Sequence, residues 1–216
     1  MLALSPARTT AEAEGVPLTG VLSLVEKGQA VSETANAVLW FVPAGGVTRP
    51  APIRAEIQTR ERRFIPRVTV VPAGSEVWFP NSDPILHNVF SVSPGNRFDL
   101  GLYRRGAGKA ARIGQPGLVR VYCNVHHAMA AYVLALETPF VARPGPDGRF
   151  SFEGLPPGSG TLYAWHERAG VTSREVSLPL GAPLALALQA NAAGTAAHLD
   201  KNGKPYRESR GDDEYR

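Results

Sequence analysis

The chain has 216 residues, of which 44% are hydrophobic and 19% are charged, and its formal net charge is +4. This length suits one large or two small domains, and the 22 glycines and 19 prolines favour short strands and turns over long helices. No apolar run approaches the roughly 18 residues of a membrane span, and the scattered arginines and lysines form no nucleic-acid-binding motif.

The first part of the chain predicts a flexible lead followed by two strands. Residues 1–17 are small and polar, which is typical of a flexible end. Residues 18–24 alternate loosely between apolar and polar types, and residues 37–43 form a compact apolar run that ends in proline, so each segment predicts a strand. Residues 27–36 lie between them and predict a loop or a short helical turn.

The middle of the chain predicts further strands separated by turns. Runs rich in β-branched and aromatic residues occur at 55–59, 64–71, 76–80 and 88–92. Residues 93–117 are rich in glycine and predict a long loop. Residues 118–122 and 130–136 predict two more strands, and these strands enclose the segment 123–129.

Beyond residue 138 a second set of strand signals begins. An Asp-Gly pair at 147–148 and a Leu-Pro-Pro-Gly turn separate apolar segments, and alternating segments follow at 171–180 and 184–188. Residues 191–216 are polar and charged with few apolar side chains, which predicts disorder.

One segment combines unusual residue types at a regular spacing. Cys123 is the only cysteine, His126 follows it by three residues, and Met129 follows by three more. A thiolate, an imidazole and a thioether are soft ligands that favour copper, and methionine is the usual weak axial ligand where two histidines and one cysteine form a trigonal plane. Such a site needs a second histidine, and His87, which is followed by Asn88, is the candidate.

The pattern His87-Asn88, then Cys123-x-x-His126-x-x-Met129, resembles the cupredoxins, and its spacing is most similar to that of amicyanin. This resemblance implies an all-β chain with a cupredoxin Greek-key β-sandwich and one type 1 copper ion held by His87, Cys123, His126 and Met129. It also implies that Asn88 ties the two ligand loops together by hydrogen bonds. The pattern departs from amicyanin at His127, where amicyanin has proline. Asp83, near His87, is predicted to be a turn residue rather than a ligand.

The Asp-Gly and Leu-Pro-Pro-Gly signals beyond residue 138 resemble the transthyretin-like, carboxypeptidase-regulatory-like β-module, a second and smaller β-sandwich without chemistry. The predicted parts are a flexible lead at 1–17, N-terminal strands at 18–59, the cupredoxin copper domain at 60–137, the transthyretin-like module at 138–190 and a disordered tail at 191–216. The N-terminal strands complete either the copper domain or the second module, and the sequence leaves both arrangements open.

The resemblance implies a periplasmic protein that carries single electrons through a type 1 copper and meets a redox protein partner of the cytochrome or dehydrogenase class. The first residues lack the apolar core of a signal peptide, so export is implied by the resemblance alone. No enzyme is predicted, because no catalytic triad or carboxylate pair lies near the ligand loop and five histidines are too few for additional copper centres.

Two other functions use the same residues. A periplasmic copper-binding or delivery protein would hold and release the metal, with His127 as an exchange ligand. A non-catalytic β-sandwich interaction module would bind a partner independently of copper. The basic residues predict a solvated face or, alternatively, a docking surface for an acidic redox partner.

Overall fold

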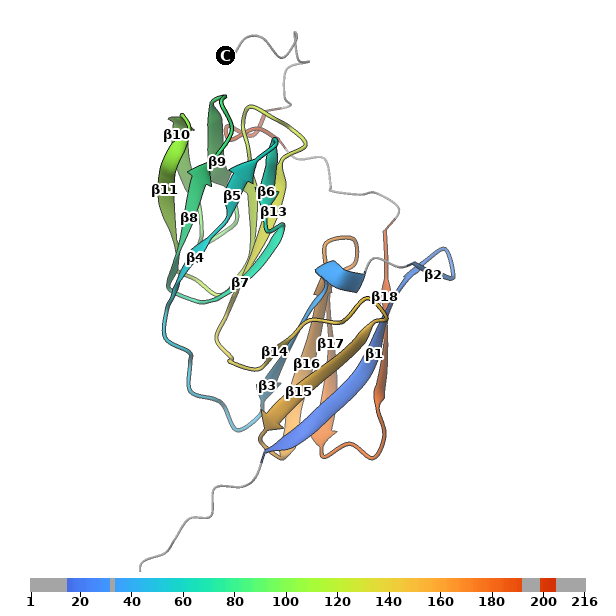
Figure 1. Ribbon diagram of the computed structural model, residues 1–216. Coiled ribbons are helices and arrows are strands. Elements are labelled where there is room, and N and C mark those ends of the chain that lie inside the picture. The colour runs from blue at the N-terminus through green and yellow to red at the C-terminus, as the bar shows by residue number, and fades with distance from the viewer. Residues whose placement is uncertain (1–14, 32–33, 192–198, 205–216) are drawn as a thin grey trace, which may run out of the picture. The chain divides into compact units, whose positions relative to one another are not determined.

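The computed structural model describes residues 15–31, 34–191 and 199–204 (Figure 1). These residues form eighteen strands and one 3-10 turn, η1 (Thr34–Asn36), so the prediction of an all-β chain is confirmed. No helix in the described ranges is long and apolar enough to cross a membrane. The chain divides into two compact units, unit 1 (Met1–Gly46, Phe140–His166 and Val171–Gln189) and unit 2 (Val47–Pro139, Glu167–Gly170 and Ala190–Arg216).

Unit 1 is built from strands of both chain ends. One sheet has the order β15-β1-β18 with β2 on β1, and the other has the order β14-β3-β16-β17. The strands are β1 (Val16–Glu26), β2 (Gln29–Val31), β3 (Val38–Pro43), β14 (Val141–Ala142), β15 (Arg149–Leu155), β16 (Gly158–His166), β17 (Gly170–Leu178) and β18 (Leu184–Gln189). The N-terminal strands β1 and β3 therefore join sheets made by the C-terminal strands, one of the two arrangements that the sequence leaves open.

Strand β1 shows why these residues form a two-layer unit. Its apolar side chains recur at every second position, so Leu18, Leu22 and Leu24 are buried while the intervening side chains face outward. At Gly20 a β-carbon would lie only 2.3 Å from the carbonyl oxygen of Leu184, so glycine permits the parallel pairing of β1 with β18.

Unit 2 contains two five-stranded sheets, and Figure 1 labels their strands. The first has the order β10-β9-β12-β13-β7, and the second has the order β11-β8-β5-β6 with β4 on β8. The bounds are β4 (Arg54–Glu56), β5 (Gln58–Arg60), β6 (Arg63–Ile65), β7 (Val68–Pro72), β8 (Ser75–Asn81), β9 (His87–Ser91), β10 (Phe98–Tyr103), β11 (Gly106–Ile113), β12 (Gly117–Tyr122) and β13 (Ala130–Leu136). Strands far apart in sequence pair here, as β7 does with β13, which is the crossover connection expected of a Greek-key sandwich.

The core of unit 2 reaches the ligand loop. Phe79, Val121 and Val133 are fully buried in one apolar cluster, and that cluster also contains Cys123 and Met129. The ligand loop is thus continuous with a close-packed interior, and such an interior resists displacement of the side chains that it holds.

The prediction of a long loop at 93–117 is wrong, because β10 and β11 occupy most of it. Both strands lie at sheet edges, so their side chains are only partly buried and their alternation is weak. A register shift between Gly106 and Lys109 breaks the pattern further. Gly108 lies in this shift with φ of +77°, and a β-carbon there would collide with the carbonyl oxygen of Phe79.

The two predicted chain ends are described only in part. Residues 1–14, 192–198 and 205–216 lie outside the described residues, so the predictions made for them are not addressed. Val16 and Pro17 belong to β1 rather than to a flexible lead. Residues 199–204 form a turn in place of the predicted disorder, with the Asp200 amide N–H donating to the Lys204 carbonyl at 2.8 Å.

Candidate metal centre

His87 opens strand β9, and its side chain is fully buried. Its ring atom Nε2 lies 2.9 Å from Oδ2 of Asp83, four residues earlier. The same carboxylate accepts hydrogen bonds from the backbone N–H groups of Glu61 at 2.6 Å and Arg62 at 2.9 Å. Both donors lie in the β5–β6 turn with φ above +50°. Asp83 therefore links this turn to the histidine, a role beyond that of the turn residue predicted from the sequence.

The environment of Asp83 decides which nitrogen of His87 carries the proton. Burial works to raise the pKa of Asp83, but the hydrogen bonds from Arg62, Glu61 and His87 outweigh it and hold that pKa below its usual value. Burial also keeps the pKa of His87 below its ordinary value, although Asp83 opposes this effect. An ionised carboxylate thus faces a neutral imidazole and accepts the proton of Nε2, which leaves the lone pair of Nδ1 available to a metal.

Cys123 follows β12, and its thiol is fully buried. The loop after it closes on itself, because the Cys123 amide donates to the Met129 carbonyl at 3.3 Å and the Met129 amide donates to the His126 carbonyl at 3.0 Å. Burial raises the pKa of the Cys123 thiol, while backbone N–H groups of His126, Asn88 and Val125 point at the sulfur and act against this rise. These amides favour the thiolate, the form that binds metals.

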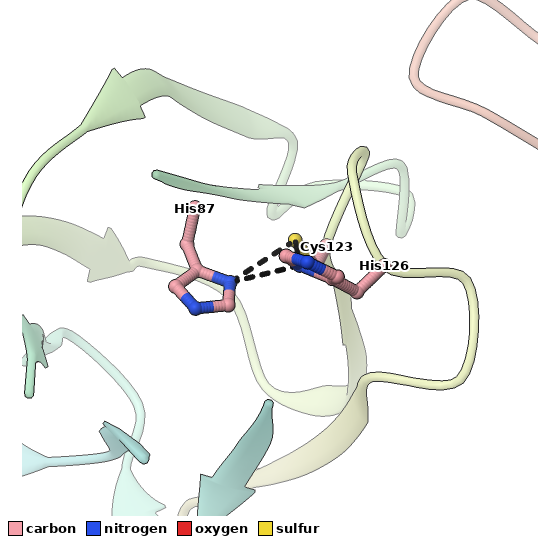
Figure 2. Close-up of side chains that lie close together, drawn as sticks. All are labelled: His87, Cys123 and His126. Atoms are coloured by element: carbon pink, nitrogen blue, oxygen red, sulfur yellow. Dashed lines mark hydrogen bonds between the residues drawn. The ribbon is translucent and has the colours of Figure 1, made fainter. Parts of the chain in front are cut away.

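Three donor atoms converge between the two loops (Figure 2). Sγ of Cys123 lies 3.8 Å from Nδ1 of His87 and 3.8 Å from Nδ1 of His126, and the two nitrogens are 3.1 Å apart. A point equidistant from the corners of this triangle lies about 2.1 Å from each, which matches metal–nitrogen bonds and is about 0.2 Å shorter than a zinc–thiolate bond. One ion fits all three donors, and two imidazoles with one thiolate are the in-plane ligands of blue-copper sites.

The structure thus brings together three of the four predicted ligands. Met129 is buried in the same apolar cluster as Cys123, one residue before β13 begins. His126 is half-buried, whereas His127 is exposed. Among the His, Cys, Asp and Glu residues that the structure describes, the group able to hold a metal consists of His87, Cys123 and His126, and His127 is not part of it.

Asn88, the residue after the ligand His87, contacts the Cys123 loop through its backbone and strand β10 through its side chain. Its backbone N–H points at the Cys123 sulfur, whereas its side-chain Nδ2 donates to Oδ1 of Asp99 at 2.6 Å. Oδ2 of Asp99 accepts a hydrogen bond from Nζ of Lys201 at 2.7 Å, and the Lys201 amide donates to Oδ1 of Asn124 at 3.1 Å. Lys201 therefore contacts Asn124 of the Cys123 loop and also Asp99, the partner of the Asn88 side chain.

Sequence reasoning missed this network and the part that Asp83 plays. Lys201 lies 77 residues after Asn124, in a segment whose polar composition predicts disorder. Nothing in the local sequence pattern indicates that Lys201 contacts residues near the metal centre. Asp83 carried a weak signal, since carboxylates are common hydrogen-bond partners of metal-bound histidines and Asp83 lies only four residues before His87.

We expect replacement of Lys201 by Met to loosen the turn at 199–204 while leaving the metal donors in place. Both side chains of the Lys201–Asp99 ion pair are more than a third exposed to solvent. Because solvent screens such a pair, its loss should lower the free energy of unfolding by less than about 1 kcal/mol. Hydrogen exchange of the amides of this turn is then up to about fivefold faster. Lys204→Met is the matched control because the same charge is lost in the same turn, and equal effects in both variants contradict the expectation.

Comparisons with known proteins give a partial match. No protein family and no curated protein matches the sequence. Many solved structures are similar over part of the chain, and three of them illustrate the match. A purple cupredoxin from Nitrosopumilus maritimus is 20% identical with a TM-score of 0.32, over 38% of this chain and 99% of that one. Amicyanin from Paracoccus versutus is 18% identical with a TM-score of 0.34, over 44% and 91%.

The third is a copper-containing nitrite reductase from Thermus scotoductus, which is 19% identical with a TM-score of 0.37, over 53% of this chain and 28% of that one. Since identities and TM-scores are this low, the donor atoms of the site carry the functional assignment.

Proposed function

We propose that unit 2 is a cupredoxin that holds one type 1 copper ion and carries single electrons. In this proposal Nδ1 of His87, Nδ1 of His126, the Cys123 thiolate and the Met129 thioether are the atoms that would hold the copper ion. The observation that carries it is the triangle of two imidazole nitrogens and one sulfur, whose size suits a single ion and in which His87 and Cys123 are buried. A copper ion bound there supplies one-electron chemistry.

The protein contributes to electron transfer by holding the metal-binding atoms in fixed positions. His87 is held by Asp83, and Cys123 leaves a strand that is paired along its length with β13. Since both ligand loops rest on packed strands, the donors would be held in one arrangement for both oxidation states of a bound copper ion. The surrounding apolar cluster excludes water from the thiolate and sets its dielectric environment.

The setting of this activity is part of the proposal. We infer a periplasmic protein that meets a redox protein of the cytochrome or dehydrogenase class and is not itself an enzyme, as the cupredoxin resemblance implies. We likewise infer that unit 1 is a transthyretin-like, carboxypeptidase-regulatory-like module, and its two small sheets support this inference.

Copper delivery is the second candidate, and the exposure of His127 beside the half-buried His126 favours it. The two functions are separated by repeated reduction and oxidation of the copper-loaded protein in the presence of a Cu(I) chelator. An electron carrier keeps its visible absorption band through many cycles. Stoichiometric loss of copper to the chelator at the first reduction contradicts electron transfer and supports delivery, and His127→Ala then slows the loss.

A further inference from the structure

The loop between β8 and β9 carries Asp83 and leads into the ligand His87, and a buried side chain at its start holds it. That side chain belongs to Asn81, the last residue of β8, which is only 1% exposed. We propose that Asn81 is a positioning residue that fixes the orientation of His87 before a metal binds. This inference deepens the proposed function, because it rests on His87 being one of the copper ligands.

The carboxamide of Asn81 binds the backbone of the loop at two points. Its Oδ1 accepts a hydrogen bond from the Asp83 amide at 2.9 Å, and its Nδ2 donates to the Ile85 carbonyl at 3.0 Å. Nδ2 also donates a longer hydrogen bond, of 3.4 Å, to the Tyr103 carbonyl on strand β10. A carboxamide offers the same donor and acceptor as a peptide group, so Asn81 serves this loop as a neighbouring strand would.

The loop, residues 82–86, lies outside the strands and is anchored from its first residue onward. The Ser82 amide donates to the Thr59 carbonyl at 2.8 Å, and the Ser82 hydroxyl accepts from Nε2 of Gln58 at 2.8 Å. Pro84 has no amide proton and restricts the backbone of the residue before it. The two contacts of Asn81 continue this anchoring along the loop toward His87.

The position of Asp83 determines how the His87 ring can lie. Oδ2 of Asp83 lies 2.9 Å from Nε2 of His87, on the opposite side of the ring from Nδ1. Figure 2 shows Nδ1 of His87 pointing toward Cys123 and His126. Because the imidazole ring is rigid, a displacement of the Asp83 carboxylate that the ring follows would turn Nδ1 away from the other two donors.

Asn81 thus acts on His87 through Asp83. Its carboxamide holds the backbone of Asp83, and the amides of Glu61 and Arg62 hold the Asp83 carboxylate. Each of these contacts joins two protein groups and needs no metal. We therefore expect His87 to keep its metal-binding orientation in the metal-free protein, and to lose part of this order when the carboxamide of Asn81 is removed.

Asn96 provides a matched control, because it makes the same kind of contact away from the metal centre. It is 5% exposed, its Nδ2 donates to the Gln115 carbonyl at 2.9 Å, and its Oδ1 accepts from the Gln115 amide at 3.0 Å. Asn96 follows the far end of β9, and Ser91 at that end is already about 13 Å along the strand from His87. Leucine has the branched shape of asparagine without its hydrogen bonds, so Asn81→Leu and Asn96→Leu are comparable substitutions.

The first measurement uses the metal-free full chain. NMR of protein with ¹⁵N-labelled histidine follows the exchange of the His87 Nε2 proton with solvent. We expect this proton to be protected in the unmodified protein, because Asp83 accepts it. In Asn81→Leu the exchange should be about tenfold faster, and in Asn96→Leu it should stay within about twofold of the unmodified protein.

The second measurement is the affinity for Cu(II), obtained by competition with a chelator. Changes behind a metal ligand cost 10- to 100-fold in affinity, so we expect Asn81→Leu to bind copper about tenfold more weakly and Asn96→Leu to bind it within about twofold of the unmodified protein. Thermal unfolding of the metal-free proteins is recorded beside these values, since a purely structural role would lower stability in both variants without separating their affinities.

Asn81→Ser keeps the test decisive if Asn81→Leu does not fold. A serine hydroxyl can still accept the Asp83 amide proton, as in the turns that serine and threonine form, but it is too short to reach the Ile85 carbonyl. We expect changes in the same directions as for Asn81→Leu but smaller, about threefold in proton exchange and in copper affinity.

Two outcomes overturn the proposal. The first is a His87 ring proton that exchanges equally fast in the unmodified protein and in the folded Asn81 variants. The second is an Asn96→Leu variant that changes proton exchange and copper affinity as much as Asn81→Leu does, which would indicate a general loss of stability. If the unmodified protein shows no intense visible band with Cu(II), the proposed function fails, whereas the metal-free exchange measurement still decides the role of Asn81.

Discussion

The Cys123→Ser variant is expected to lose the intense visible absorption of the copper-loaded protein completely. That band arises from charge transfer between thiolate and copper, and a serine hydroxyl supplies neither the soft donor nor the same charge. Cys123 is the only cysteine, so no other residue can replace it. Removal of a ligand should lower copper affinity by more than about 100-fold, since even changes behind a ligand cost 10- to 100-fold. Optical titration of the metal-free protein with Cu(II) measures both effects.

His127→Ala is the matched control for this measurement. His127 is exposed and does not belong to the donor triangle, although it adjoins His126. We expect this variant to keep the band and the affinity. A visible band that survives in Cys123→Ser, or one that disappears in His127→Ala, contradicts the assigned ligands.

The Asp83→Asn variant is expected to raise the reduction potential of the centre. The carboxylate accepts the proton of Nε2 and places a negative charge behind the His87 ring, which stabilises the more highly charged oxidised metal. An amide of the same shape removes that charge. If the substitution weakens the binding of Cu(II) about 10- to 100-fold more than the binding of Cu(I), the reduction potential rises by roughly 60 to 120 mV. Voltammetry of the copper-loaded protein measures this shift.

Glu61→Gln separates the hydrogen bond from the loss of charge. Glu61 lies in the same turn, and only its backbone N–H contacts Asp83, so its exposed carboxylate can be neutralised without breaking that contact. We expect a much smaller change of potential, because solvent screens an exposed charge. Equal shifts in the two variants would show that the Asp83 hydrogen bond has no special effect on the metal.

These two experiments probe different levels of the structure. Cys123 lies in a motif that is visible in the sequence, with His126 and Met129 at three-residue steps. Asp83 acts through a contact with His87 that depends on where β9 starts and on the turn that its carboxylate holds. The first prediction therefore tests the motif, and the second tests the folded environment around it.

The sequence by itself determined the all-β class, most strand positions and the ligand candidates. Strand positions follow from the local alternation of side chains, and the clustered ligands follow from spacing within one loop, so both are readable without the fold. It did not determine the edge strands β10 and β11, whose exposed and glycine-containing segments lack that alternation. Nor did it decide that β1 and β3 join the C-terminal strands, since pairing between distant segments leaves no local mark.

Only the tertiary structure decided how the site is completed. His87 and Cys123 are 36 residues apart, and the sandwich brings their donor atoms to 3.8 Å. The partners of Asp83 and the contacts of Lys201 also depend on segments that meet only when the sheets are assembled. The reason is physical, because a hydrogen bond between distant residues is specified by the geometry of both segments at once and by neither one alone.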